Sequence, residues 1–227
     1  MLSIQTIKTI FTEEITDQQG TLHDVFDDGS HLFARSILPR LADIKTGDRV
    51  QGGVAIRATD EEIAVHPYIF RLVCKNGMIR AQTIHSRRLV IGDLETSANP
   101  SWEIREAVRG CCDAGAFADA TRDMRAAVDT QADMALSLMP FINTLPKELQ
   151  AKFLSQIFEH FRAEGGGTRY NLLNAVTSLA RDTSDPQQKW DLEELGGAIA
   201  ANNPTPKPQM SARRQTPIVR DTVSSTS

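Results

Sequence analysis

A run of aromatic and branched residues followed by an Asn-Gly pair constrains the fold of this chain most. Residues 68–74 read Tyr-Ile-Phe-Arg-Leu-Val-Cys, a composition typical of a β-strand. Asn76-Gly77 follows closely, and this pair favours a two-residue hairpin turn because both positions tolerate positive φ. Residues 79–91 are then expected to return as the partner strand. The sequence therefore predicts an antiparallel hairpin within residues 65–92.

Short β-strand patterns precede this hairpin. Residues 31–38 and 49–57 contain branched and aromatic side chains, and polar turn signals separate them. Gly52 and Gly53 interrupt the second pattern, and glycines inside a strand typically mark a bulge or a close approach of two backbones. Together with the hairpin, these strands predict an antiparallel β-meander.

The first 30 residues are acidic. They contain one base, Lys8, and six carboxylates. We expect an N-terminal segment made of a short strand followed by loops, before the β-rich part begins at residue 31.

Helix signals begin at Asn99. Asn99-Pro100 suits an N-cap followed by proline at the first helical position, and an alanine-rich, helix-favouring stretch then runs to about residue 138. A second helix is predicted over 145–163, because six of its apolar residues share one face. These residues are Leu149, Phe153, Leu154, Ile157, Phe158 and Phe161.

Three consecutive glycines at 165–167 end the second helix. A third helix is predicted over 168–181, and Asp191 to Glu194 has the form of a capping box for a short last helix. A β-rich part (31–92) followed by a helical part (99–200) is typical of the α+β class. We expect one domain over 31–200, in which an N-terminal antiparallel β-meander is packed by C-terminal helices.

The composition changes after Ala201. Proline, serine and threonine dominate residues 201–227, and four bases occur before the first acid of this stretch: Lys207, Arg213, Arg214 and Arg220. We expect a disordered tail. It is interpreted either as a solvating tail or as one that adds non-specific phosphate contacts.

Several functional classes lack their motifs. The three cysteines, Cys74, Cys111 and Cys112, make no disulfide framework, and no apolar stretch is long enough for a membrane helix, so we expect a cytoplasmic protein with no membrane partner. The sequence has no zinc-ligand spacing, no phosphate-binding glycine loop and no nucleophile elbow. We therefore predict no catalytic residue, no metal site and no cofactor, while an enzyme with an unfamiliar site stays open.

Positive charge is concentrated in the hairpin. The formal net charge of the chain is −4, yet residues 63–92 contain no Asp or Glu. The bases of this stretch are predicted to contact nucleic-acid phosphates, with Tyr68 as a residue that stacks on a base. Two other interpretations stay open: a solvated sheet face whose bases pair with acids elsewhere, and a surface for another acidic partner. The bases are Arg71, Lys75, Arg80, Arg87 and Arg88.

Asn174 and Thr177 form a polar pair on the third predicted helix. They are three positions apart, so they share one helix face. They are predicted to hydrogen-bond a ligand or the hairpin, or to satisfy buried backbone groups where the helix packs on the sheet.

Three stretches of the sequence resemble a known family. Residues 49–57 (RVQGGVAIR) and 66–78 (HPYIFRLVCKNGM) resemble the core of the phage/plasmid-like proteins, number 932 in the series of domains of unknown function. Residues 170–177 (YNLLNAVT) are similar to the C-terminal motif of that family, in which an aromatic residue precedes Asn-Ala-x-Thr. The resemblance covers about residues 30–185, and the N-terminal part of this chain is short for the family.

The resemblance implies a biological context. Such proteins occur on phages, plasmids and bacterial chromosomes, without a settled biochemical activity. A mobile-element context favours DNA handling, and a β-meander followed by helices is similar in outline to phage single-strand annealing proteins. We therefore predict a non-catalytic protein that binds single-stranded DNA, and a homo-oligomer would line several basic hairpins along one groove. The alternative is a protein–protein interaction module of phage or plasmid origin that binds no nucleic acid.

Overall fold

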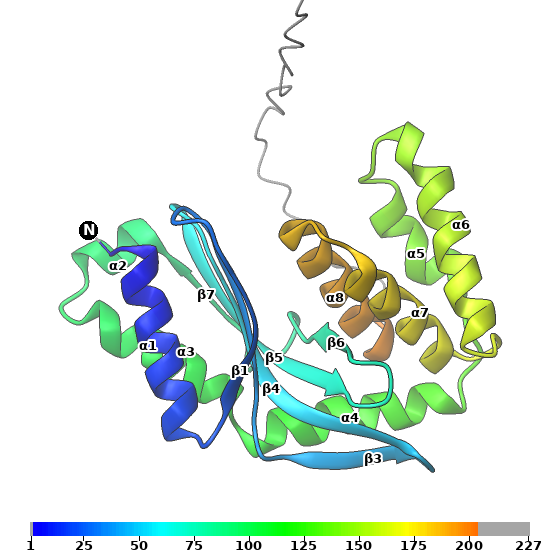
Figure 1. Ribbon diagram of the computed structural model, residues 1–227, viewed down its shortest axis with the longest axis horizontal. Helices are drawn as coiled ribbons and strands as arrows, with labels where there is room; N and C mark the ends of the chain where they lie inside the picture. Colours follow the sequence, from blue (N-terminus) through cyan, green and yellow to red (C-terminus); the bar gives the residue numbers. More distant parts are fainter. Residues whose placement is uncertain (1, 204–227) are drawn as a thin grey trace, which may run out of the picture.

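The computed structural model describes residues 2–203 and contains an antiparallel sheet of seven strands with helices on both faces (Figure 1). The predicted α+β class, with an N-terminal sheet packed by C-terminal helices, is confirmed. The strands are β1 (Thr21–Asp27), β2 (Leu32–Ile37), β3 (Leu41–Lys45), β4 (Asp48–Ala58), β5 (Glu62–Arg71), β6 (Asn76–Ile79) and β7 (Arg87–Val90). The tail predicted after Ala201 lies, from residue 204 onward, outside the described residues.

The helices follow the sheet in sequence, except the first. They are α1 (Ile4–Asp17), α2 (Ile91–Thr96), α3 (Pro100–Cys111), α4 (Ala114–Val128), α5 (Met134–Ile142), α6 (Lys147–Ala163), α7 (Arg169–Asp182) and α8 (Pro186–Ala200). Asn99 caps α3 as predicted, because its side chain accepts the Trp102 N–H. The predicted second and third helices correspond to α6 and α7, with bounds within two residues. No helix within residues 2–203 is long and apolar enough to cross a bilayer.

The hairpin is present, but its turn differs from the prediction. β5 pairs with β6 from Tyr68–Ile79 to Arg71–Asn76, residues 72–75 form the turn, and Lys75 takes a φ of 53°. The predicted Asn-Gly turn is wrong, because Asn76 and Gly77 belong to β6. A Cβ on Gly77 would lie 2.0 Å from the Tyr68 Oη, so this glycine makes room for the phenol.

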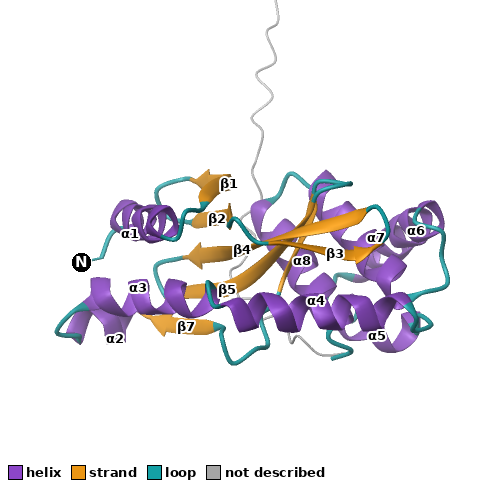
Figure 2. Ribbon diagram, turned by 90° about the horizontal axis from the view of Figure 1, so that it is seen from below, coloured by secondary structure: helices purple, strands orange, loops and turns teal. Residues whose placement is uncertain are grey.

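The predicted return strand over 79–91 is also wrong in its length. β6 ends at Ile79, and the other end of β5, from Glu62 to Val65, pairs with β7. Two short strands thus share one side of β5, and Figure 2 shows β7 as the outermost strand of the sheet at that end.

The two faces of the sheet carry different helices. Leu32, Val54, Ile56, Ile63 and Val65 share a core with Ile7, Phe11, Ile104 and Val108 of α1 and α3. The alternate residues Phe33, Ala55, Ala64 and Tyr68 pack with Trp190 of α8. Since side chains alternate along a strand, β2, β4 and β5 are buried on both faces.

The first helix was not among the predictions. Ser3 caps α1 by accepting the Thr6 N–H, and the helix buries Ile7, Phe11 and Ile15. The predicted strand followed by loops is therefore wrong for residues 4–17. The three- and four-residue spacing of the apolar side chains is the signal that identifies this helix.

The double glycine in β4 has the role that was predicted for it, a close approach of backbones. A Cβ on Gly53 would lie 1.9 Å from the carbonyl oxygen of Ser36 in β2, and one on Gly52 would lie 2.8 Å from the Phe117 ring of α4. The absence of side chains lets β4 lie against both neighbours.

The last helix begins earlier than predicted. The side chain of Asp185 accepts the Gln188 N–H and caps α8, so the predicted capping box from Asp191 to Glu194 is wrong and lies in the helix interior. Gly197 lets α8 approach the end of β6, because a Cβ there would lie 1.9 Å from the Ile79 carbonyl oxygen. α8 is thus held directly against the sheet backbone.

Candidate functional site

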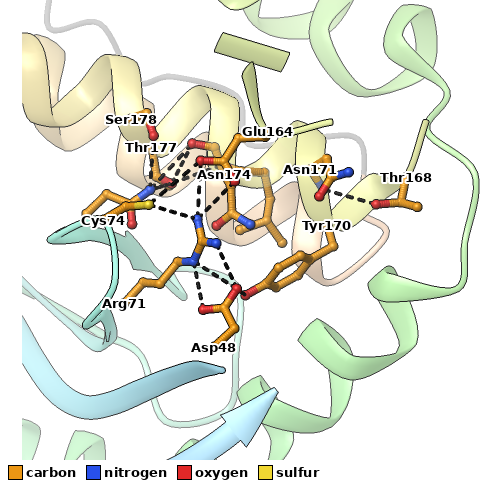
Figure 3. A network of polar contacts seen from close by, with 12 residues as sticks. Asp48, Arg71, Cys74, Glu164, Thr168, Tyr170, Asn171, Asn174, Thr177 and Ser178 are labelled. Carbon is orange, nitrogen blue, oxygen red and sulfur yellow. Dashed lines mark hydrogen bonds and ion pairs between the residues drawn. The ribbon is translucent and has the colours of Figure 1, made fainter. Parts of the chain in front are cut away.

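Arg71 lies at the centre of a buried polar network at the end of β5 (Figure 3). Its Nε and Nη2 donate to the Asp48 carboxylate over 2.7–3.1 Å, and its Nη1 donates to Glu164 at 3.1 Å. The guanidinium also lies 5.7 Å from the ring centroid of Tyr170, whose hydroxyl donates to Asp48 at 2.9 Å. These contacts join β4 and β5 to α7 and to the end of α6.

The network neutralises Arg71 within the fold. Arg71 is 8% exposed and has a carboxylate on two sides. Burial acts to raise the pKa of Asp48, but the Arg71 guanidinium and the Tyr170 hydroxyl outweigh burial and hold that pKa below its usual value. The positive charge of Arg71, which suggested a phosphate contact, is therefore paired with carboxylates inside the molecule.

Asn174 and Thr177 lie next to this network and contact the hairpin. The Asn76 Nδ2 donates to the Thr177 Oγ1 at 2.8 Å and to the Asn174 carbonyl oxygen at 3.4 Å. Asn76, Asn174 and Thr177 are all buried. The Thr177 hydroxyl also donates to the backbone carbonyl oxygen of Leu173 at 3.0 Å, and Asn174 contacts the hairpin through its backbone carbonyl. The geometry of Thr177 therefore corresponds to two of the predicted outcomes, a contact with the hairpin and a partner for a buried backbone group.

Arg80 and Tyr68 are also buried. The Arg80 Nη2 donates to Asp123 of α4 at 2.7 Å, and Arg80 is 6% exposed. Tyr68 is 2% exposed in the cluster around Trp190, and burial raises the pKa of its phenol well above the usual value. In this conformation the Tyr68 ring is enclosed by the core and presents no face to a base.

Lys75, Arg87 and Arg88 are exposed, but they do not form one surface. Lys75 occupies the β5–β6 turn, whereas Arg87 and Arg88 lie on β7, opposite Val65 and Ala64 at the other end of β5. The predicted basic hairpin is therefore divided in space. Two of its bases are buried in ion pairs, one lies at the turn, and two lie on the edge of the sheet.

The β7 arginines are held by short local contacts. The Arg87 Nη1 donates to the carbonyl oxygens of Ile84 and Ser86, at 2.5 and 2.9 Å. The Arg88 Nη1 donates to Glu62 at 3.1 Å. Both side chains are thus anchored on the surface while their outer sides face solvent.

A second buried polar network lies between the sheet and α8, and none of its members was predicted as a site residue. The Arg35 Nε donates to Glu193 at 2.6 Å, with both side chains 2% exposed. Asp24 of β1 pairs with Arg35 at 3.3 Å and with Lys189 at 2.6 Å. Arg35 and Glu193 are 158 positions apart, so no local spacing in the sequence signals the pair.

His66 and Glu194 extend this interface. The Trp190 Nε1 donates to Glu194 at 2.7 Å, and the His66 Nε2 lies 3.6 Å from the same carboxylate oxygen. Burial lowers the pKa of His66 to about 3, so the imidazole is neutral at physiological pH. Its ring lies 5.8 Å from the Trp190 ring and acts as a packing group.

Geometry for catalysis is not apparent in the described part of the chain. No group of three or more His, Cys, Asp or Glu within residues 2–203 is placed to hold a metal ion. One hollow beside Tyr68 and another beside Glu194 each offer about 10 Å³, room for a single water. Neither approaches the roughly 300 Å³ or more of an ordinary substrate pocket.

No family model, no curated protein and no solved structure matches this chain. The resemblance of residues 49–57, 66–78 and 170–177 to the phage/plasmid-like proteins therefore stays a prediction.

Proposed function

We propose that this protein is a non-catalytic nucleic-acid-binding protein that contacts single-stranded DNA through the open edge of β7. The supporting observation is the pair of exposed arginines, Arg87 and Arg88, on this strand. β7 pairs with β5 on one side, and no described strand pairs with the other side. Side chains alternate along a strand, so Arg87 and Arg88 project to opposite faces of the sheet, and a nucleic-acid strand that crosses the open edge can place a phosphate beside each of them.

Neighbouring residues supply further contacts of the same kind. Ile84, three residues before the start of β7, is 82% exposed and offers an apolar surface to an unstacked base. Lys75 at the far end of β5 adds a separate phosphate contact. Unpaired bases are a feature of single strands, which is why a single strand is favoured over a duplex.

Fluorescence anisotropy with a fluorescein-labelled 30-nucleotide oligothymidine tests this proposal. Salt titration of the wild-type chain is expected to give a negative slope of log affinity against log salt. Arg87→Gln/Arg88→Gln is expected to flatten that slope by about 1.4, since each phosphate contact on a single strand contributes about 0.7.

Lys147→Gln/Lys152→Gln is the matched control, because both lysines are exposed on α6, away from β7. It is expected to leave the slope unchanged. The absence of binding by the wild-type chain at 50 mM salt, or equal slopes for the β7 variant and the wild type, contradicts the proposal.

A second candidate function, a protein–protein interaction module, is favoured by α5. Its sequence MALSLMPFI has one polar residue, yet Leu136 is 54% exposed and Met139 is 42% exposed. A helix that is apolar on all sides is ordinarily buried, so its outer face fits a partner such as a second copy of this chain.

Sedimentation velocity is expected to show a dimer that Leu136→Gln/Met139→Gln converts to a monomer. A wild-type chain that stays monomeric at 100 μM contradicts this candidate.

A further inference from the structure

Glu62, at the start of β5, pairs with an arginine on each of the two strands beside it. Its Oε1 accepts a hydrogen bond from the Arg57 Nη2 of β4, and the same oxygen lies 3.1 Å from the Arg88 Nη1 of β7. Arg57 and Arg88 both lie opposite Ala64, two positions after Glu62, so all three charged side chains are on one face of the sheet. One carboxylate is therefore shared between β4 and the β7 edge.

The two arginines hold this carboxylate with different strength. The Arg57 side chain is 10% exposed, lies 5.6 Å from the Trp190 ring centroid, and has Glu62 as its one ion-pair partner within residues 2–203. The Arg88 side chain is 40% exposed. Breaking a buried pair leaves an uncompensated charge and is costly, whereas a surface pair contributes little and is easily exchanged. Glu62 is therefore fixed by Arg57, and Arg88 is the partner that can turn to another anion.

A nucleic-acid phosphate at Arg88 competes with Glu62 for the same guanidinium. Carboxylate and phosphate oxygens both accept from the N–H groups of arginine, and two anions beside one cation repel each other. When Arg88 turns to a phosphate, Arg57 remains beside Glu62, so the carboxylate keeps a cationic partner. The exchange therefore leaves no buried charge unpaired.

We propose that Glu62 is an internal competitor that sets the affinity of the β7 edge for nucleic-acid phosphates. It pairs with Arg88 in the free protein and stays with Arg57 when Arg88 binds a phosphate. The proposal rests on the proposed function and names the residue that regulates the same site. Glu62 and Arg57 are positioning residues, because both act through Arg88 rather than by contact with the nucleic acid.

Glu62→Gln tests the competition. The amide oxygen still accepts from Arg57 but no longer attracts Arg88 as a charge, so the affinity for labelled 30-nucleotide oligothymidine at 50 mM salt is expected to rise about threefold, the factor of an ordinary surface ion pair. Glu61→Gln is the matched control, because it removes the same charge from an exposed neighbour that has no ion pair within the described chain. It is expected to change the affinity by less than about 1.5-fold. If the two variants bind equally, or if Glu62→Gln binds no more tightly than the wild type, the inference is wrong while DNA binding by the β7 edge stands.

Arg57→Gln tests the same competition in the opposite direction. It leaves Arg88 as the cation beside Glu62, so Arg88 is held more firmly and the affinity is expected to fall about threefold. In the Glu62→Gln background the same substitution is expected to have no effect. Equal weakening in both backgrounds would mean that Arg57 acts by its own charge, which contradicts the inference.

A mutant cycle with Arg88 tests the competition without disturbing the buried Arg57. Arg88→Gln removes the group for which Glu62 and the phosphate compete, so Glu62→Gln in that background is expected to leave the affinity unchanged. A gain of the same size with and without Arg88 would show general repulsion by Glu62 and would overturn the inference. A wild-type chain that binds no oligothymidine at 50 mM salt overturns both this inference and the proposed function.

Discussion

Arg71 is the residue whose replacement tests the buried network most directly. Arg71→Ala leaves Asp48 and Glu164 without their shared cation, and removal of one partner of a buried pair costs about 3–5 kcal/mol. We expect urea unfolding to show a decrease of this size in the free energy of unfolding. Lys75→Ala, four residues along and exposed, is the control and is expected to change the free energy of unfolding by less than about 0.5 kcal/mol. Equal small effects for both would contradict a structural role for Arg71.

The effect of Arg71→Ala also depends on pH. The folded-state pKa of Asp48 lies below the usual value of 3.8, so the ionised carboxylate stabilises the fold at every pH above 3.8. This stabilisation is lost as the pH falls through the folded-state pKa, because Asp48 then becomes protonated. In the variant the burial that raises the pKa of Asp48 is no longer offset by Arg71, so Asp48 takes up a proton at higher pH than in the wild type. The difference between wild type and variant is therefore expected to be largest near pH 8 and to shrink as the pH falls.

At the scale of elements, the approach of α8 to β6 depends on Gly197. Gly197→Ala places a methyl group 1.9 Å from the Ile79 carbonyl oxygen, so the helix or the strand must shift. We expect a loss of about 1–3 kcal/mol in the free energy of unfolding. Gly92→Ala in α2 meets no atom within 4 Å and is expected to stabilise the protein by about 0.5–1 kcal/mol, as alanine does inside a helix. Stabilisation by both substitutions would show that α8 is not pressed against the sheet.

Elements with local signals were predictable, and contacts between distant elements were not. The cap at Asn99 and the apolar face of residues 145–163 are periodic or adjacent features, so the sequence predicts them within two residues. The turn was misplaced, because Gly77 is required by the Tyr68 ring across the strand pair rather than by turn geometry. α1 was missed although its apolar spacing was present.

In the candidate site, too, local features were predictable from the sequence and contacts between distant residues were not. An excess of bases in residues 63–92 is visible in the sequence, but their partners come from far away: Asp48 for Arg71 is 23 positions distant, and Asp123 for Arg80 is 43. Burial of Arg71 and Arg80 follows from these pairings, which no local pattern encodes. Only the fold separates the bases that are buried from the bases that reach solvent.

At the scale of the whole molecule, β4 and β5 connect cores on the two faces and at the two ends of the sheet. Val54 and Ile56 belong to the core with α1 and α3, while Ala55 packs with Trp190, and Val50 of the same strand belongs to the core with α4 to α7. Strands that contribute to all three cores cannot lose one core and keep the others. We therefore expect residues 2–203 to unfold as one cooperative unit.

Phe11→Ala tests this coupling from a distance. Phe11 is fully buried between α1 and the sheet, and its truncation is expected to cost about 3–5 kcal/mol. Trp190 lies in the cluster on the other face and becomes the only tryptophan once the exposed Trp102 is replaced by Phe. If the cores unfold together, Phe11→Ala in this background lowers the urea midpoint of Trp190 fluorescence by about 1–2 M. The far-UV circular dichroism midpoint is expected to fall equally. A Trp190 midpoint that stays in place while part of the helical signal is lost earlier would show that α1 and its core unfold independently of α8.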